Sequence, residues 1–443
     1  MIKTKYRKIV TELPHKSDLE IINKISTLES IQSSKELPIV WDRANDFQIF
    51  DRWGNCWIDM TSSIFVTNAG HNSKKNNFRI SKVIEKGLLH AYCYPTAERA
   101  AFLEKLIQFT PQYLEKASLA STGTEASERA IKLARLYNLD KSPDRNIIIG
   151  GTGNYHGKTL GALMSATDDK AKNWIGYHDP NMIQLPFPYP WILEKNNMSG
   201  KQLFDNHIKE LNNKIDLDRI CAMIIESYQG WGAVFYPLDY VKEMEIWCKQ
   251  RDILLIADEI QSGFGRTGKL FGYQHYNIIP DMVICGKGIS GGLPVSAVMG
   301  RKDLIELDSS LTSTHGGHPV SCAGALGNLE DFEALDLLNK AKNTGIYFKK
   351  QLENLKKKFP NKISRIEGNG MVWGIYFKKS KENNDLDIDF VDMMVDKLFL
   401  QGIFSIRTSR GVIKMGPPLT ISTEALHEAI KVHEEIIEEM LLA

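Results

Sequence analysis

Two stretches decide the fold of this chain: Ile253-Leu-Leu-Ile-Ala-Asp258-Glu259 and Asp281-Met-Val-Ile-Cys-Gly-Lys287. Each contains a short apolar run, with the length and composition of a strand that is buried on both faces. Beyond each run stands a reactive side chain, Asp258 in the first stretch and Lys287 in the second. We therefore expect two buried strands whose carboxyl ends carry an aspartate and a lysine.

The same pattern extends outward, because similar apolar runs alternate with amphipathic segments from about residue 98 to residue 300. We expect strands at 117–120, 146–150, 221–225, 253–257, 282–285 and 296–300, and helices at 97–108, 125–137 and 240–251. Apolar strands between amphipathic helices are typical of an α/β fold, with a mostly parallel or mixed sheet covered on both faces. Active sites in such sheets lie at the carboxyl ends of the strands.

The flanking segments have a different pattern. Near the N-terminus, two runs of alternating polar and apolar residues within 46–59 predict a hairpin that turns at Arg52-Trp-Gly-Asn. Near the C-terminus, we expect a strand near 370–377 and helices at 321–358, 388–401 and 423–441. These segments predict a small α+β domain. We expect an N-terminal arm with part of that domain at 1–75, a large domain at 76–325, and the C-terminal part of the small domain at 326–443.

Composition excludes several classes of function. The net charge of the 443 residues is +1, which offers no field to attract nucleic acid or an anionic membrane. No apolar run approaches the ~18 residues of a membrane span. Cysteines occur without metal-like spacing, so we expect reduced thiols in a soluble, cytoplasmic protein. They stand at positions 56, 93, 221, 248, 285 and 322.

The pairing of Lys287 with Asp258 matches the needs of pyridoxal phosphate. Lys287 lies among glycines, where its amine can approach a carbonyl carbon, and Asp258 can keep a pyridinium nitrogen charged. Taken alone, Lys287 is also compatible with a surface lysine in a glycine-rich loop. Other motifs bear on this choice.

Ser121-Thr-Gly-Thr-Glu-Ala opens a helix directly after a strand. Main-chain N–H groups at Gly123 and Thr124 would make a seat for a phosphate. A plain capping box, Thr122 with Glu125, fits the same residues, and one structure can serve both purposes.

Further candidates follow three of the strands. Tyr155 could stack on a planar ring, or pack locally beside His156. Glu226 ends the strand before the one that leads to Asp258. A carboxylate at this place could support a cofactor site, or it could equally form an ordinary salt bridge. Gln261 could reach a phenolic oxygen, although the glycines after it also suit a turn-rich loop.

Thr314, before a Gly-Gly pair, could donate a hydroxyl to a phosphate. His315 and His318 lie close by, but the sequence offers no third ligand near them, and we expect no metal site.

Taken in order, these motifs resemble those of the class III aminotransferases, which are fold-type I pyridoxal-phosphate enzymes. The resemblance runs from the hairpin near residue 47 to Leu419 and beyond. Its parts are Ser-Thr-Gly-Thr-Glu-Ala, Tyr-His-Gly, Glu-x-x-Gln-Gly, Asp-Glu-Ile-Gln-Ser-Gly-Phe-Gly-Arg-Thr-Gly, Gly-Lys-Gly, Ser-Thr-His-Gly-Gly and Pro-Pro-Leu. It implies a large domain with a seven-stranded, mostly parallel mixed sheet, and a small α+β domain formed by the two ends of the chain.

The resemblance also implies individual roles. Lys287 would form the internal aldimine and move the proton, while Asp258 would hold the pyridinium nitrogen. The remaining cofactor-binding residues would be Gly123, Thr124, Tyr155, His156, Glu226, Gln261 and Thr314. In this family, the residue that matches Thr314 reaches the phosphate of the neighbouring subunit, so a homodimer is implied.

Departures from the family pattern concern the substrate. Lys414 stands where many members have a carboxylate-clamping Arg, and Trp231 stands where members that use ω-amino acids often have a Glu. A 4-aminobutyrate or ornithine aminotransferase is therefore disfavoured. Phe65, Trp231 and Tyr94 could line a pocket for a bulkier or less acidic amine, or simply pack in the core.

The leading hypothesis is amino-group transfer between an amine or amino acid and a 2-oxo acid, through a Lys287 aldimine. An amino-acid racemase or epimerase of the same family is the alternative, and decarboxylation or a non-catalytic relative are further ones. The donor, the acceptor, the pathway and any pairing of dimers into tetramers stay open.

Overall fold

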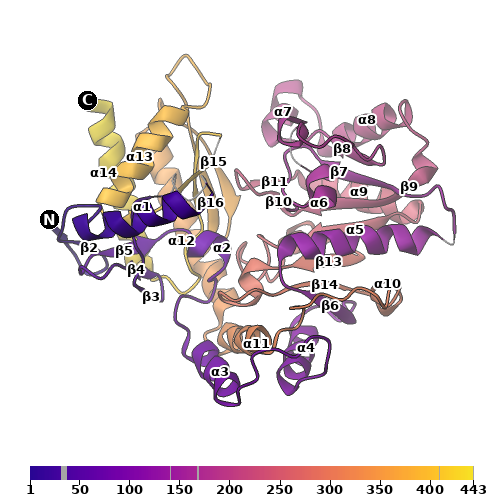
Figure 1. Ribbon diagram of the computed structural model, residues 1–443. Helices are drawn as coiled ribbons and strands as arrows, with labels where there is room; N and C mark the ends of the chain where they lie inside the picture. The colour runs from indigo at the N-terminus through magenta and orange to yellow at the C-terminus, as the bar shows by residue number, and fades with distance from the viewer. Residues whose placement is uncertain (31–36, 140, 167–168, 409, 443) are drawn as a thin grey trace. The chain divides into compact units, whose positions relative to one another are not determined.

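The computed structural model describes residues 1–30, 37–139, 141–166, 169–408 and 410–442, so residues 31–36 of the expected N-terminal arm lie outside it. The chain divides into two compact units (Figure 1). The first unit combines the two ends of the chain, Met1–Ser73 and Asn339–Ala443, and the second is the continuous segment Lys74–Leu338.

A seven-stranded sheet forms the centre of the second unit. Its order is β6 (Lys116–Ala120), β14 (Ser296–Gly300), β13 (Met282–Cys285), β12 (Leu254–Asp258), β9 (Ile220–Glu226), β7 (Ile147–Gly151) and β8 (Met182–Leu185). β14 runs antiparallel to both of its neighbours, and the remaining pairs are parallel. This confirms the predicted α/β class with a mixed, mostly parallel sheet. β8 was not expected from the sequence.

Helix α5 (Gly123–Leu139) covers one face of this sheet (Figure 1). Half of its buried positions carry small residues, and three of these, Ala126, Ala130 and Ala134, pack with the central strands in one apolar core. Small side chains let the helix approach the sheet closely, as expected of tightly packed layers. α9 (Leu238–Gln250) contacts β12 and packs against α8 (Gly200–Asn212), which follows the short α7 (Pro190–Asn196).

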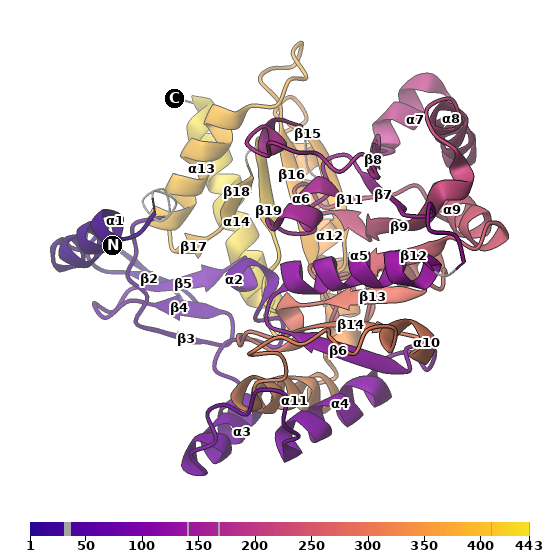
Figure 2. The ribbon, with the colours of Figure 1, turned by 45° about the vertical axis from the view of Figure 1, so that its right-hand side comes forward.

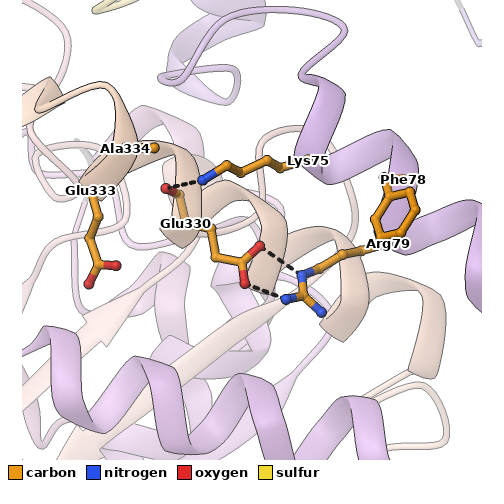
Figure 3. A pocket seen from close by; sticks show the side chains of 6 residues that line it. All are labelled: Lys75, Phe78, Arg79, Glu330, Glu333 and Ala334. Atoms are coloured by element: carbon orange, nitrogen blue, oxygen red, sulfur yellow. Dashed lines mark hydrogen bonds and ion pairs between the residues drawn. The ribbon is translucent and has the colours of Figure 1, made fainter.

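Three helices of the second unit lie together, α3 (Lys74–Glu85), α4 (Ala97–Phe109) and α11 (Pro319–Ala334) (Figure 2). α11 approaches α3 closely, because a Cβ at Gly327 would lie 2.7 Å from the Cα of Asn76. A two-pronged ion pair between Arg79 and Glu330 joins the same helices beside a surface pocket of about 480 Å³ (Figure 3). Lys75 Nζ donates to the Glu330 carbonyl at 3.1 Å. This pocket therefore presents charged groups that already bind one another.

The first unit contains two sheets. One has the order β1 (Ile2–Lys3), β2 (Lys8–Ile9), β5 (Cys56–Asp59), β4 (Gln48–Phe50) and β3 (Arg43–Asn45), with β17 (Ile403–Phe404) also paired to β5. The other has the order β15 (Ile363–Asn369), β16 (Val372–Phe377), β19 (Val412–Met415) and β18 (Ile406–Thr408). The antiparallel pairing of β4 with β5 confirms the predicted hairpin. The helices are α1 (Leu19–Leu28), α12 (Leu337–Lys358), α13 (Ile388–Leu400) and α14 (Thr423–Leu442).

An unusual turn, α2 (Ser62–Phe65), follows β5. Its four residues all have positive φ, between 50° and 69°, so the turn is left-handed. For side chains other than glycine this conformation is strained. The turn is anchored by Asp59 Oδ1, which accepts from the Ser62 N–H, and by Ser62 Oγ, which donates to the Gly416 carbonyl at 2.7 Å.

The remaining elements are short: α6 (Leu160–Met164), α10 (Lys302–Ile305) and the two-stranded hairpin β10 (Tyr228–Gln229) with β11 (Val234–Phe235). Within the part of the chain that the structure describes, no helix is both long and apolar enough to cross a membrane.

Candidate active site

Lys287 lies just beyond the carboxyl end of β13, as the sequence predicted. It has a φ of 43° and begins a single 3-10 turn, Lys287–Ile289. Gly286, before it, packs against Ile260 and the backbone of Gly123, where a Cβ would meet Ile260 at 3.3 Å. The lysine is partly buried. Burial lowers the pKa of the Lys287 amine, and the carboxylates of Asp258 and Glu226 oppose this effect. A lysine with a lowered pKa has a larger neutral fraction, and the neutral amine is the nucleophile.

Asp258 is the last residue of β12 and is only 3% exposed. Its Oδ2 lies 2.7 Å from His156 Nδ1, and its Oδ1 accepts from the Ile260 N–H at 3.0 Å. A carboxylate can only accept, so His156 donates through Nδ1. Among the described residues, the buried Nε2 of the same ring has no hydrogen-bond partner. An imidazole fixed in this way holds the charge of Asp258 in place.

Glu226 ends the neighbouring strand, β9, directly beside Asp258 in the parallel register. Its Oε2 accepts from the Tyr155 N–H at 3.0 Å and from the Gly230 N–H at 3.2 Å. Burial is the main cause that raises the pKa of Glu226, to about 7, while His156 acts in the opposite direction. Glu226 thus holds two loops at the carboxyl edge of the sheet.

Tyr155 and Gln261 lie close to Glu226, in the loops after β7 and β12. Tyr155 is 47% exposed, so part of its ring stays open. Gln261 lies against Gly230, where a Cβ would meet its amide oxygen at 3.4 Å. The structure therefore gathers Asp258, His156 and the Glu226 loops at one edge of the sheet.

The amino end of α5 has both features that the sequence suggested. Glu125 Oε2 accepts from the N–H groups of Ser121 and Thr122, both at 2.9 Å, so the capping box is present. Gly123 and Thr124 follow in the first turn, whose N–H groups have no intrahelical acceptor. Thr124 Oγ1 lies 2.7 Å from Thr159 Oγ1. A Cβ at Gly157 would lie 2.0 Å from Thr124 Oγ1, so this glycine permits the approach.

Glu259 is a residue that sequence analysis missed. It is fully buried and accepts from Ser227 Oγ, Ser262 Oγ, the Gly272 N–H and the Tyr273 N–H. These bonds tie the segment after Asp258 to the end of β9. The signal was a carboxylate directly behind a buried strand, where a charge is tolerated only with such partners.

Thr314 has an exposed side chain, and its carbonyl accepts from His90 Nε2 at 2.9 Å. The adjacent Ser313 hydroxyl donates to Glu125 Oε1 at 3.1 Å, near the start of α5. His90, His315 and His318 lie around this segment. Within the described ranges, no group of three His, Cys, Asp or Glu side chains is placed to hold a metal ion.

The four expected substrate residues lie in different units. Phe65 and Lys414 belong to the first unit, where Lys414 Nζ lies 4.4 Å from the centre of the Phe65 ring and both residues are buried. Trp231 belongs to the second unit, at the tip of the β10–β11 hairpin. Tyr94, also in the second unit, is 75% exposed.

The fold is shared with solved structures of transaminases. An (S)-enantioselective omega-transaminase from Thermomicrobium roseum aligns with a TM-score of 0.87 at 26% identity, covering 96% of this chain and 99% of that chain. An amine transaminase from an uncultivated Pseudomonas species, solved in its PLP-bound form, aligns with a TM-score of 0.82 at 24% identity, over 93% of this chain and 97% of its own. The chain therefore has the fold of the fold-type I transaminases.

The sequence is also similar to characterised relatives. Acetylornithine aminotransferase of Caldanaerobacter subterraneus subsp. tengcongensis is 30% identical over 406 residues, 91% of this chain and 95% of the relative. Leucine/methionine racemase of Thermococcus litoralis is 31% identical over 409 residues, 90% of each chain. The profile of the aminotransferase class-III family matches residues 30–437. The chain therefore belongs to the class III aminotransferases, a family of pyridoxal-phosphate-dependent enzymes.

The residues at the strand ends fit this cofactor. His156 presents an unpaired, buried ring nitrogen within the described part of the chain, and it bonds the carboxylate that would face a pyridinium. Gly123 and Gly286 both pack against the Ile260 side chain, on which a Cβ at either position would press. The main-chain N–H groups in the first turn of α5, which have no intrahelical acceptor, suit a phosphate.

Proposed function

We propose that this protein is an aminotransferase that moves an amino group between an amine or amino acid and a 2-oxo acid, using pyridoxal phosphate. The observation that carries the proposal is the cluster at the carboxyl edge of the sheet. It combines Lys287, with its lowered pKa, and the hydrogen-bonded pair of Asp258 and His156.

In this proposal, the chain's own side chains hold and orient the cofactor. Lys287 Nζ would carry it, and Asp258 would hold the proton of the ring nitrogen. Tyr155 would stack on the cofactor ring, with His156 beside it, and Gln261 would bond the phenolic oxygen. Glu226 would support this site from the neighbouring strand. Gly123, Thr124 and Thr314 would bind the phosphate. When bound, pyridoxal phosphate supplies an electron sink that acidifies the C–H bond beside the amine nitrogen.

Proton movement would fall to Lys287. As a neutral amine, Lys287 Nζ would take the proton from the substrate α-carbon and hold it for return to the substrate side of the site. The lowered pKa of Lys287 suits this role, because the neutral amine is the base. The carboxylates of Asp258 and Glu226 limit how far that pKa falls, so the amine can also hold the proton between the two steps.

We further propose a homodimer in which Thr314 serves the neighbouring subunit's phosphate site, with the first unit acting as the small domain and the second as the large one. The exposed side chain of Thr314 supports its availability to a second subunit. All six cysteines are free thiols, which supports action in a reducing compartment such as the cytoplasm.

Racemisation is the second candidate, and one observation favours it. The leucine/methionine racemase of Thermococcus litoralis is as similar to this chain as the aminotransferases are. Racemisation needs the same lysine but no 2-oxo acid. Consumption of a 2-oxo acid therefore separates the two activities.

Borohydride trapping tests the role of Lys287. Reduction of the holoenzyme should fix the cofactor on the peptide that contains Lys287, as read by mass spectrometry. Lys287→Ala should lose this label and about 10³-fold or more in turnover, because the carrier and the base are both removed. Lys302→Ala, at an exposed lysine of α10, is the matched control and should keep both. Full turnover in Lys287→Ala would contradict the proposal.

A further inference from the structure

The turn that carries Lys287 needs support from outside its own backbone. Lys287 has a φ of 43°, a conformation that strains a residue with a Cβ and persists only where neighbouring groups enforce it. The 3-10 turn Lys287–Ile289 is a single turn, and Gly291 and Gly292 follow it with φ values of 65° and 135°. Glycines leave a backbone free to move, so the turn must be held by its neighbours.

Asn328 supplies the first contact, from the helix α11 that packs against this turn. It is 1% exposed, and its Nδ2 donates to the carbonyls of Gly288 and Ile289 at 3.0 and 3.1 Å. A side-chain amide nitrogen has two N–H groups, so one can serve each carbonyl. The reverse orientation would set the amide oxygen against two carbonyl oxygens, so the donors face the turn. Asn328 therefore binds the two residues that follow Lys287.

Asn76 supplies a second contact, from α3. It is 6% exposed, and its Nδ2 donates to the Ser290 carbonyl at 3.1 Å. Three consecutive carbonyls, at 288, 289 and 290, thus accept from asparagine amides on two helices. A Cβ at Gly291 would lie 2.7 Å from Asn328 Oδ1 and 3.0 Å from Asn76 Nδ2, so this glycine allows both amides to approach. We call Asn76 and Asn328 the asparagine clamp.

Packing between the two helices does not by itself account for the clamp. A buried amide is unfavourable unless its N–H groups find acceptors, and an apolar side chain fills such a space without that requirement. Asparagine is also a poor helix former. Both clamp residues are nonetheless buried and helical, and both donate to the same turn. Their shared target is the backbone that directly follows Lys287.

We propose that the asparagine clamp positions Lys287, because it fixes the backbone from which the Lys287 amine reaches the cofactor. Both asparagines act through the turn, so they are positioning residues rather than catalytic residues. The inference rests on the proposed function, since it takes Lys287 as the residue that carries the cofactor. Displacing a reacting group by about 1 Å can cost about 100-fold in rate, so loss of the clamp should slow the reactions of this amine.

The test follows the attachment of pyridoxal phosphate to Lys287, which needs no substrate and no turnover. Pyridoxal phosphate is added to the apoprotein at saturating concentration, so that the rate reports attachment rather than binding. The Lys287 amine condenses with the aldehyde and releases water, and borohydride added at successive times reduces the resulting C=N bond. Mass spectrometry then measures the labelled fraction of the peptide that contains Lys287.

The clamp variants should attach the cofactor slowly. Asn328→Leu keeps a side chain that branches at Cγ and removes both donors, so the attachment rate should fall by about tenfold or more. Asn76→Leu removes one bond and should lower the rate by about threefold. Asn328→Thr keeps one donor and should have an intermediate rate, and it replaces Asn328→Leu if that variant does not fold.

Asn138→Leu is the matched control. Asn138 is also a fully buried helical asparagine, but its Nδ2 donates to the Ala134 carbonyl of its own helix, α5. Thermal unfolding midpoints of the apoproteins measure the stability that each variant loses. Asn138→Leu should lose stability and still attach the cofactor within about twofold of the wild-type rate, because the turn keeps its contacts.

The outcomes separate the clamp from the proposed function. An attachment rate in Asn328→Leu equal to that of Asn138→Leu, or wild-type rates in both Asn328→Thr and Asn76→Leu, would overturn the inference and leave amino-group transfer intact. Slow attachment in the clamp variants, with a wild type that attaches the cofactor but consumes no 2-oxo acid, would remove amino-group transfer and support the clamp. A wild type that is never labelled at Lys287 would contradict both.

Discussion

Asp258, Glu226 and Glu259 show how individual residues make this site possible. Each is a carboxylate at or just beyond the carboxyl end of a buried strand, where an unpaired charge would be costly. Each has its own donors: His156 for Asp258, two backbone N–H groups for Glu226, and two hydroxyls with two N–H groups for Glu259. These donors reduce the cost of burying the carboxyl groups, but burial still raises the pKa of Glu226 and of Glu259 to about 7.

His433 carries a residue-scale prediction about stability. It is fully buried on α14, donates through Nδ1 to the Ala429 carbonyl at 2.8 Å, and has a pKa lowered to about 4 by burial. Below about pH 6.5 the unfolded chain takes up a proton that the folded chain refuses until about pH 4. The free energy of unfolding should therefore fall by up to about 3 kcal/mol as the pH drops through this window.

Denaturant unfolding of His433→Leu measures this effect, because removing the imidazole should flatten the pH dependence between 4 and 6.5. His427→Leu, at an exposed position on the same helix, should leave the dependence unchanged. An equal slope in wild type and His433→Leu would show that another group is responsible.

Helices and strands whose apolar residues form a clear run or recur at regular spacing could be predicted from the sequence. The six expected strands of the large sheet all exist. Most of them are runs of apolar residues with polar or glycine ends, whereas β6 contains Ser118. β8 was missed, since Met182-Ile-Gln-Leu is an edge strand interrupted by a polar residue. β10 and β11 have two residues each and carry no usable period. The left-handed turn at Ser62–Phe65 is held by tertiary bonds to Asp59 and Gly416, which local sequence cannot reveal.

The left-handed turn gives a prediction at the scale of an element. Ile64 has a φ of 60° and is 44% exposed. Its backbone is therefore strained, and its side chain gains little stabilisation from packing. Ile64→Gly should raise the free energy of unfolding by about 0.5–1 kcal/mol, because glycine adopts positive φ without a Cβ clash.

The matched control is Ile346→Gly, at a 65% exposed position inside α12. There the same replacement should lower the free energy of unfolding by about 1 kcal/mol, since glycine weakens a regular helix. Destabilisation of the same size at both positions, measured in denaturant, would mean that the turn carries no strain.

For the whole molecule, the sequence predicted the positions of the candidate residues on the strands better than the bonds that hold them. Asp258 and Lys287 could be found because reactive side chains beyond buried runs meet at one edge of a parallel sheet. The role of Glu259 could not be found, because it comes from bonds to distant segments, such as those from Ser227 Oγ and the Gly272 N–H. The substrate roles of Phe65 and Lys414 stay predictions.

The visible spectrum of the purified protein with pyridoxal phosphate tests the central claim most directly. It should be titrated with amino acids in the absence of any 2-oxo acid. The account predicts that the absorbance of the bound cofactor converts to that of pyridoxamine phosphate, that one 2-oxo product forms per site, and that added 2-oxo acid reverses the change. A persistent cofactor band with loss of optical rotation of the amino acid, or no cofactor band at all, would contradict amino-group transfer.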